Sequence, residues 1–302
     1  MAARGLAGNL PEPQNRAVRG GVALERYRVD DYRLFAPVRL GPIVAYAQVD
    51  TGAKRSFVRR SFATEFPRVG RGHMRGALHQ TEVEQCRAAG VSLLGRDFAA
   101  LVLSVQPDEL CGYATLPFPV AMTAGIDMLY GAPLFLNFTA REIGFVEPSW
   151  SPGADSAPVA ALELVRGFAL FDLTLGGQRL RALFDTGAGY SVLNARHLEG
   201  LLGELREAAA ENVTDPAGGD AVVPVYAHDS LSISGHSLGP GRFLVMDLTS
   251  VEQAMSATVD FVFGFDTMVN HAWVVDVPGG RLVRTGGPAP SQTGRGQRGR
   301  GR

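Results

Sequence analysis

The same four residues, Asp-Thr-Gly-Ala, occur twice in the chain, at residues 50–53 and 185–188, and each copy follows an apolar run typical of a β-strand. A carboxyl group can act as a general acid or base, and two carboxyl groups that share one proton can activate water and protonate a leaving group. One Asp-Thr-Gly alone is most often a surface turn. A double copy arises by chance on the order of once in a few hundred chains or less. The repeat therefore singles out Asp50 and Asp185 as candidates for such chemistry.

The residues on either side of the two copies also match, at the same spacing of 135 positions. The matched residues are Leu40-Gly41 with Leu175-Gly176, Ala47 with Ala182, Val49 with Phe184, Ser56 with Ser191 and Phe57 with Val192. A second landmark, an apolar stretch that ends in Gly, follows each copy. Residues 128–131 end 79 positions after Gly52, and residues 261–264 end 77 positions after Gly187. The chain therefore reads as two homologous halves.

At these residues the chain resembles the retropepsin-like aspartic proteases, and in having two lobes in one chain it resembles the wider pepsin-like group. The resemblance implies a mainly β, bilobal acid-protease fold, with two retropepsin-like closed β-barrel lobes, short helices and a pseudo-twofold axis. Each lobe of that family supplies one catalytic Asp. By resemblance, Asp50 and Asp185 form one site that hydrolyses peptide bonds, and Thr51 and Thr186 lock the two loops together through crossed hydroxyl-to-backbone hydrogen bonds.

The other loop residues have separate expected roles. Gly52 and Gly187 let the backbone turn tightly and bring its N–H groups close to the carboxylates, where a Cβ would crowd. Ala53 and Ala188 lack the hydroxyl that could hydrogen-bond a carboxylate and favour its charged form. We therefore predict a pair of aspartates less acidic than a pepsin-like pair, and activity at mildly acidic to neutral pH.

The resemblance also implies a β-hairpin flap that closes over substrate and excludes water. Two Gly-rich stretches are candidates: residues 70–80, with Gly76, in the first half, and residues 216–226, with Gly218 and Gly219, in the second. Without the family context, such stretches are more often plain surface loops. Whether the protein has one flap or two stays open at this point.

Composition and patterning divide the chain into five parts. They are a flexible N-terminal arm at 1–24, lobe 1 at 25–146, a Pro/Ser/Gly-rich linker at 147–158, lobe 2 at 159–285 and a disordered Gly/Arg-rich tail at 286–302. Each lobe is predicted to open with a hairpin, over residues 32–49 and 168–184. A short helix is predicted after each Asp-Thr-Gly loop, over residues 57–66 and 194–205, with Asn194 as an N-cap.

Several function classes find no support in the composition. The net charge is −1, so partnership with nucleic acid is unlikely apart from weak contact by the Arg/Gly tail. The six His residues include no pair at the i, i+4 spacing of a helical zinc site, and Cys86 and Cys111 are too far apart for a Cys-x-x-Cys knuckle, so we expect no metal and no cofactor. No signal segment and no apolar stretch near the roughly 20 residues of a membrane span is visible, which favours a cytoplasmic protein with unpaired thiols.

Three interpretations of the repeat remain. The first is an aspartic endopeptidase that acts as a monomer on a peptide or protein substrate. The second is a non-catalytic two-lobed module for peptide binding or assembly, although such a descendant would usually have lost one Asp, and both are present. The third places each Asp opposite its equivalent in another copy of the protein. Equal spacing in the two halves makes the pair within one chain the simpler interpretation.

Overall fold

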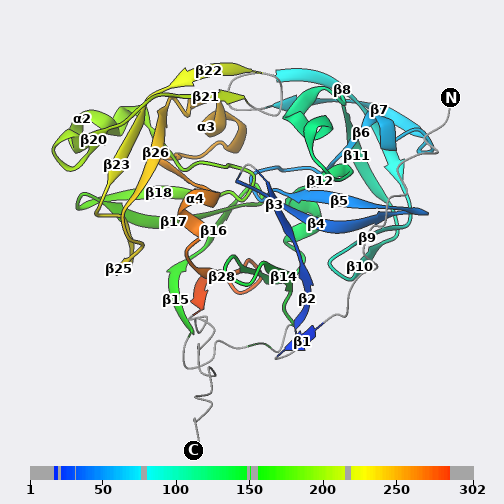
Figure 1. Ribbon diagram of the computed structural model, residues 1–302, viewed down its shortest axis with the longest axis horizontal. Helices are drawn as coiled ribbons and strands as arrows, with labels where there is room; N and C mark the ends of the chain where they lie inside the picture. The colour runs from blue at the N-terminus through cyan, green and yellow to red at the C-terminus, as the bar shows by residue number, and fades with distance from the viewer. Residues whose placement is uncertain are drawn as a thin grey trace, which may run out of the picture.

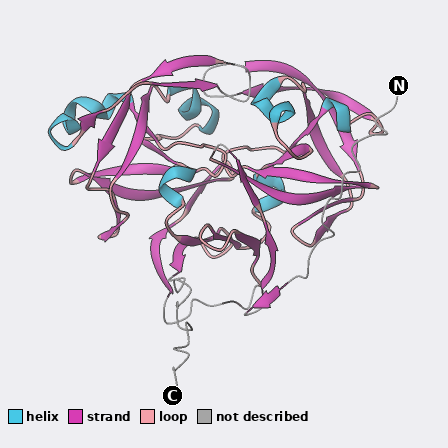
Figure 2. Ribbon diagram, viewed as in Figure 1, coloured by secondary structure: helices cyan, strands magenta, loops and turns pink. Residues whose placement is uncertain are grey.

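The computed structural model describes residues 17–19, 22–30, 32–75, 80–147, 150, 156–214 and 219–285, and these residues are mainly β (Figure 2). Helices are short; the longest α-helix among them is α3, Thr249–Met255. The mainly β fold expected from the sequence is confirmed. Figure 1 shows two groups of strands side by side, one from each half of the chain, above a third group to which both halves contribute.

The first half forms a sheet of ten described strands in the order β10-β9-β4-β5-β12-β6-β11-β8-β7, with β3 paired to β4. The predicted opening hairpin is present as β4 and β5, and it turns at Gly41, whose φ is +57°. The strands are β3 Arg28–Asp30, β4 Arg33–Leu40, β5 Ile43–Val49, β6 Phe57–Arg59, β7 Arg68–Arg75, β8 Gln80–Ala88, β9 Val91–Leu93, β10 Arg96–Phe98, β11 Leu101–Gln106 and β12 Val120–Ala124. Between and after them come the 3-10 helices η1 Arg60–Phe62 and η2 Leu110–Thr115 and helix α1 Ile126–Leu129.

The second half forms another sheet of ten described strands, in the order β20-β23-β26-β19-β27-β18-β17-β24-β25, with β16 paired to β17. Its opening hairpin, β17 and β18, also agrees with the prediction. The strands are β16 Glu163–Val165, β17 Phe168–Leu175, β18 Gln178–Phe184, β19 Val192–Asn194, β20 Arg206–Glu207, β23 Val225–His228, β24 Ser232–Ile233, β25 His236–Ser237, β26 Gly241–Met246 and β27 Phe261–Phe263. A separate two-stranded hairpin joins β21 Glu211–Thr214 to β22 Asp220–Val223. The remaining helices are η3 Ala195–His197, α2 Leu198–Leu201, η4 Leu202–Glu204 and α4 Phe265–Met268.

The two large sheets share a pairing pattern that positions the Asp-Thr-Gly loops. In the first, β5 lies between antiparallel β4 and parallel β12. In the second, β18 lies between antiparallel β17 and parallel β27. Residues 45–49 of β5 and 182–184 of β18 are buried on both faces, and a strand buried on both faces reads as a nearly continuous apolar run, which explains the apolar residues just before Asp50 and Asp185. Beneath the second loop, Phe184, Phe263 and Trp273 pack edge to face or tilted, and all three are fully buried.

A third sheet of seven described strands joins the two halves, in the order β1-β2-β14-β13-β28-β29-β15. It lies in the lower part of Figure 1. Its strands are β1 Ala17–Arg19, β2 Val22–Arg26, β13 Leu134–Asn137, β14 Glu142–Phe145, β15 Ser156–Ala161, β28 Ala272–Asp276 and β29 Arg281–Thr285. The halves meet where β13 pairs with β28. Strands β1 and β2 thus begin within the segment expected to be a flexible arm, and β15 begins within the expected linker. They form the two ends of this sheet, where β2 pairs with β14 and β15 pairs with β29.

Some sequence-based expectations are wrong. Within the described residues, the end strands of each large sheet do not pair with each other, so neither sheet is the closed barrel that was expected; β7 belongs instead to a long hairpin with β8. The helix predicted over 57–66 is strand β6 followed by one turn of 3-10 helix, because β6 is held between β11 and β12. Asn194 does precede a helical segment, but its side-chain amide donates to the Val259 carbonyl at 3.0 Å and makes no cap.

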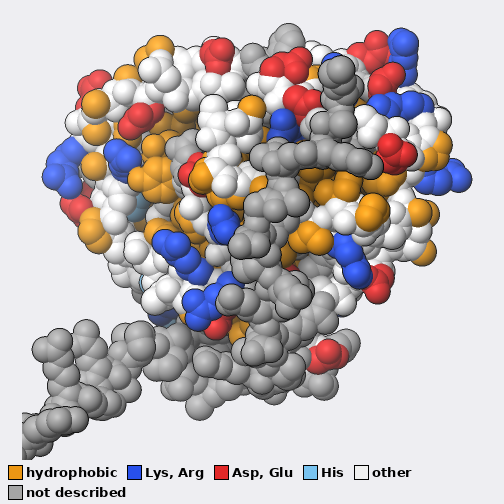
Figure 3. Space-filling view, turned by 45° about the vertical axis from the view of Figure 1, so that its right-hand side comes forward, with side chains coloured by type: hydrophobic (Ala, Val, Ile, Leu, Met, Phe, Trp, Pro, Cys, Tyr) orange, Lys and Arg blue, Asp and Glu red, His pale blue; other side chains and the backbone are white. Residues whose placement is uncertain are grey.

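The surface carries charges of both signs across the face shown in Figure 3, in line with the net charge of −1. Among the residues that the structure describes, no helix is both long enough and apolar enough to cross a membrane. Cys86 is a free, buried thiol.

Candidate active site

The two Asp-Thr-Gly loops begin at the ends of β5 and β18 and are held there by matching backbone hydrogen bonds. The Asp50 N–H donates to the Ala124 carbonyl, and the Asp185 N–H donates to the Phe263 carbonyl, each at 3.0 Å. Ala124 and Phe263 end β12 and β27, the parallel neighbours of β5 and β18. Each Asp is therefore positioned by two parallel strands of its own half, the one it follows and the one that accepts its N–H.

The threonines join the two loops through four hydrogen bonds, which form two matching pairs. The Thr51 hydroxyl donates to the Phe184 carbonyl at 2.9 Å and accepts from the Thr186 N–H at 3.0 Å. In the other direction, the Thr186 hydroxyl donates to the Val49 carbonyl at 2.9 Å and accepts from the Thr51 N–H at 3.1 Å. Both threonines are fully buried. The crossed hydrogen bonds expected from the sequence are thus present and bring two segments 135 residues apart face to face.

The carboxyl groups face each other across the glycines. The Gly52 N–H donates to Asp50 Oδ1 at 2.9 Å, and the Gly187 N–H donates to Asp185 Oδ1 at 2.8 Å. A Cβ on Gly52 would lie 2.2 Å from Asp185 Oδ2, and a Cβ on Gly187 would lie 2.2 Å from Asp50 Cγ. Because real Cβ atoms essentially never come within 3.0 Å of another heavy atom, both loops require glycine here, as the sequence indicated.

Burial is the main cause of the raised pKa of both aspartates. Burial, and then the charge of Asp185, raise the pKa of Asp50 well above its ordinary value. Burial also raises the pKa of Asp185, while N–H donors from Gly187 and Ala188 oppose that rise. Two carboxyl groups in contact cannot both ionise easily, so they titrate as a pair that retains one proton into a higher pH range than an exposed carboxyl group would.

A second layer of polar residues supports each loop and was missed by the sequence-based reasoning. The Ser56 hydroxyl donates to Asp127 Oδ1 at 2.6 Å, and the Ser191 hydroxyl donates to Asp266 Oδ1 at 2.8 Å. Each serine oxygen also accepts the N–H of a glycine that precedes α1 or α4, at 2.9 Å from Gly125 and 3.0 Å from Gly264. The serines had been matched in the sequence, but Asp127 and Asp266 had not.

The landmark assigned to the first half is therefore wrong. The structural equivalent of Gly264 is Gly125, and not Gly131 at the end of residues 128–131. A Cβ on Gly125 would lie 2.6 Å from the Ala53 oxygen, and one on Gly264 would lie 2.5 Å from the Tyr190 carbonyl carbon. The shared pattern is Gly, an apolar residue and Asp at the start of a one-turn helix. That pattern was visible in the sequence as Gly-Ile-Asp and Gly-Phe-Asp.

Above the aspartates lies a large cavity, called the cleft below, with a volume of about 1340 Å³. Asp50 and Asp185 line it, together with residues of two hairpins, β7–β8 and β21–β22, which lie at the top of Figure 1. The hairpin residues that line it are His73, Met74, Gln80, Gln85, Glu211, Asn212, Val213, Thr214 and Asp220. Of the glycines predicted for a flap, Gly76 and Gly218 lie outside the described residues, and Gly219 directly precedes β22.

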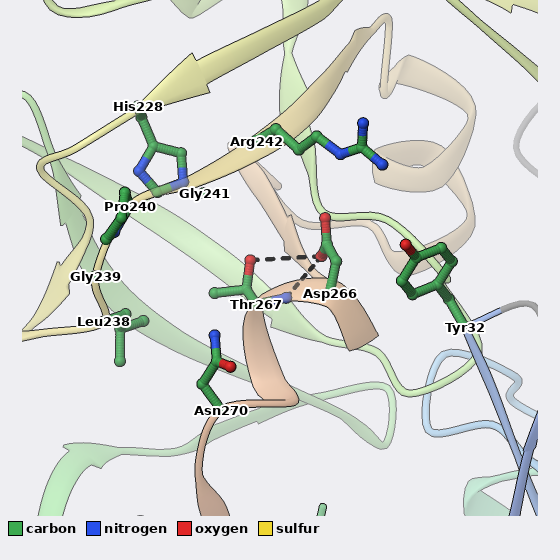
Figure 4. Close-up of a pocket in the computed structure, with 10 residues that line it drawn as sticks. All are labelled: Tyr32, His228, Leu238, Gly239, Pro240, Gly241, Arg242, Asp266, Thr267 and Asn270. Atoms are coloured by element: carbon green, nitrogen blue, oxygen red, sulfur yellow. Dashed lines mark hydrogen bonds between the residues drawn. The ribbon is translucent and has the colours of Figure 1, made fainter.

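A smaller cavity of about 190 Å³ lies between α4, the start of β26 and Tyr32 (Figure 4). Asp266 turns one carboxylate oxygen toward Thr267, while Oδ2 has no hydrogen-bond partner. His228 also lines this cavity, and burial lowers the pKa of its imidazole to about 4, so the ring is neutral at neutral pH. The cavity contains neither Asp50 nor Asp185. Within the described part of the chain, no group of three or more His, Cys, Asp or Glu side chains is placed to hold a metal ion.

The threonine hydrogen bonds make a strong prediction for stability. Thr51→Val removes a hydroxyl whose partners, at Phe184 and Thr186, are buried, so we expect the free energy of unfolding to fall by about 2–5 kcal/mol. Thr186→Val should have a similar cost, and the double variant should cost less than the sum because both hydroxyls join the same loops. Denaturant unfolding measures these values. The exposed Thr115, whose hydroxyl donates to the Gly112 carbonyl, provides the control; an equal cost for Thr115→Val would contradict the prediction.

Comparison with known families agrees with this geometry. Residues 171–267 match a family model described as aspartyl protease. The matched segment runs from β17 into α4 and includes the Asp185 loop, Ser191 and Asp266. The second half of the chain is therefore similar to an aspartyl protease domain. No match was found among curated proteins.

Proposed function

We propose that this protein is an aspartic endopeptidase in which Asp50 and Asp185 together hydrolyse peptide bonds. The observation that carries the proposal is the pair of partly buried carboxyl groups, held face to face by the crossed threonine hydrogen bonds and lining a large cleft. The family match over residues 171–267 supports proteolysis as the activity. The repeat of the same loop in the first half supports Asp50 as the second carboxyl group.

In the proposed reaction, the pair begins with one shared proton and one water molecule between the carboxyl groups. The charged carboxylate accepts a proton from the water as its oxygen attacks the peptide carbonyl carbon, and the protonated carboxyl group donates its proton to the carbonyl oxygen. The proton taken from water then passes to the amide nitrogen as the C–N bond breaks, and the other carboxylate accepts a proton from a hydroxyl group of the tetrahedral intermediate as that oxygen becomes the carbonyl of the new carboxyl group. The pair ends with one proton, ready for the next water molecule.

We also assign a flap role to both hairpins, β7–β8 and β21–β22. Residues of each line the cleft opposite the aspartates, and a hairpin in that position can close over an extended peptide and exclude water. The two-flap arrangement follows from the presence of one such hairpin in each half. Because both aspartates belong to one chain, a monomer is sufficient for activity.

Cleavage of a peptide library, followed by mass spectrometry across a pH series, tests the proposal. We expect cleavage that a statine inhibitor blocks, since statine mimics the tetrahedral intermediate. We expect the optimum at mildly acidic to neutral pH, because burial raises the pKa of both aspartates and so extends the singly protonated pair upward in pH. The absence of cleavage at every pH would overturn the proposal in favour of a peptide-binding module. An optimum near about pH 2–3, as for pepsin-type pairs, would contradict only the pH prediction.

A further inference from the structure

The rims of the cleft differ in charge at the residues that follow the two Asp-Thr-Gly-Ala loops. In the first half, Ala53 is followed by Lys54 and Arg55, and in the second, Ala188 is followed by Gly189 and Tyr190. All four residues line the cleft. The two loops are otherwise closely matched in hydrogen bonding, so this pair of cations is a local departure from the repeat.

Neither cation is paired with an acidic side chain in the described part of the protein. Lys54 and Arg55 are both exposed, and within the described residues neither has an acidic group within ion-pair distance. The third cation of the cleft, Arg33, is different: its side chain is only 17% exposed and lies 3.8 Å from Asp30. A cation that lines a binding cleft without a partner is available to an acidic group of the ligand.

The acidic residues of the cleft lie elsewhere. Glu211 and Asp220 belong to the β21–β22 hairpin of the second half, where Arg242 lies 3.8 Å from Glu211 and the Thr214 hydroxyl donates to Asp220. Glu109 lies in the first half, at the start of η2, and within the described residues it forms no ion pair with Lys54 or Arg55. The positive charge is therefore concentrated at the rim next to Asp50.

Chain geometry sets where on a substrate this charge acts. Consecutive Cα atoms are 3.8 Å apart, so the Cα of Lys54 lies within about 15 Å of the Cα of Asp50, and that of Arg55 within about 19 Å. An extended peptide advances by about 3.3 Å per residue. Lys54 and Arg55 can therefore contact substrate side chains within about five residues of the peptide bond held at the aspartates. These side chains lie on the side of that bond that faces the Asp50 loop.

From these observations we infer that Lys54 and Arg55 form a specificity site that selects peptides with an acidic side chain on one side of the cleaved bond. The inference rests on the proposed function for its reaction, and it adds the class of substrate. The selected side chain is Asp or Glu, because a carboxylate pairs with both an ammonium and a guanidinium group. No matching preference is expected on the other side, where Gly189 and Tyr190 carry no charge.

Matched peptides that differ only in Asp, Asn or Lys at one position test the inference. We expect kcat/KM to be about three- to tenfold higher for Asp than for Lys at one or two positions on one side of the cleaved bond, as for exposed charges near each other in water. The preference should shrink between about 0.1 M and about 1 M salt, where the Debye length falls from about 10 Å to about 3 Å.

Charge reversal identifies the residues. Lys54→Glu with Arg55→Glu should invert the preference at the same position, and Lys54→Gln with Arg55→Gln should remove it. Arg60→Glu with Arg87→Glu provides the control, because both arginines are exposed and neither lines the cleft; this variant should keep the parent preference. An unchanged profile in the Lys54 and Arg55 variants would overturn the inference.

A binding measurement separates this inference from the proposed function. Fluorescence anisotropy with labelled versions of the same peptides, using the Asp185→Asn variant so that no peptide is cleaved, reports binding alone. Tighter binding of the Asp peptide, lost in Lys54→Gln with Arg55→Gln, supports the specificity site even where the parent cleaves nothing. Equal binding of the Asp and Lys peptides overturns it, whether or not the parent is a peptidase.

Discussion

Asp50→Asn is expected to lower kcat/KM for any cleaved peptide by about 10³-fold or more, because the amide can neither accept a proton from water nor share one with Asp185. Asp185→Asn is expected to have an effect of the same size, since the two carboxyl groups act as a unit and removing either one removes the pair. Initial-rate measurements on the best peptide of the library give these values.

Asp50→Asn should also change how the stability of the protein depends on pH, and a variant that merely fails to fold would not show this change. Burial raises the pKa of Asp50 in the folded state, so the unfolded chain binds fewer protons, and stability falls as pH rises above the unfolded value of about 3.9. Asp50→Asn removes this cost. We expect its melting temperature at pH 7 to equal or exceed that of the parent, with the advantage lost at about pH 3, where the carboxyl group is protonated in both states.

The control for both measurements is Asp97→Asn. Asp97 is an exposed carboxylate of the first half, 3.9 Å from Arg39 and outside the cleft, and its substitution should change neither rate nor melting temperature appreciably. Retention of substantial activity by Asp50→Asn would show that the catalytic groups lie elsewhere.

Gly187→Ala is expected to reduce kcat/KM by about 10²-fold while the protein stays folded. The added Cβ would lie 2.2 Å from the Asp50 carboxyl carbon, so the carboxyl groups must move apart by roughly an ångström, and a displacement of that size costs about 10²-fold in rate. Gly52→Ala should behave alike, because its Cβ would meet Asp185 at the same distance. Steady-state kinetics measure the loss, and circular dichroism confirms the fold.

Gly203→Ala is the matched control for the glycine variants. Gly203 lies in η4, and a Cβ there would meet no atom within 4 Å. This variant should therefore keep full activity. Full activity in Gly187→Ala would contradict the close approach of the two loops.

Local patterns in the sequence were sufficient to predict an element wherever its structure depends on a single strand pair or a single turn. Both opening hairpins were predicted correctly, because alternating apolar residues around Gly41 and Gly176 specify them locally. Prediction failed where pairing partners decided the outcome. Residues 57–66 have a helical pattern, yet β6 forms because β11 and β12 flank it. Gly125 was passed over for Gly131 although its Gly-Ile-Asp pattern is visible in the sequence, because the hydrogen bond to Ser56 that gives this pattern its place beside the loop forms only in the folded protein.

By itself, the sequence determined the chemistry available to this protein: two aspartates in repeated Asp-Thr-Gly-Ala loops, each preceded by a strand and separated by 135 residues. Only the tertiary structure brings the two aspartates together, because their approach depends on hydrogen bonds between segments far apart in the chain, such as Thr51 to Phe184 and Thr186 to Val49. The raised pKa of each aspartate has the same origin, since the burial that raises both values exists only after the loops have packed together. The cleft, its two hairpins and the uneven charge of its rims likewise depend on which strands pair.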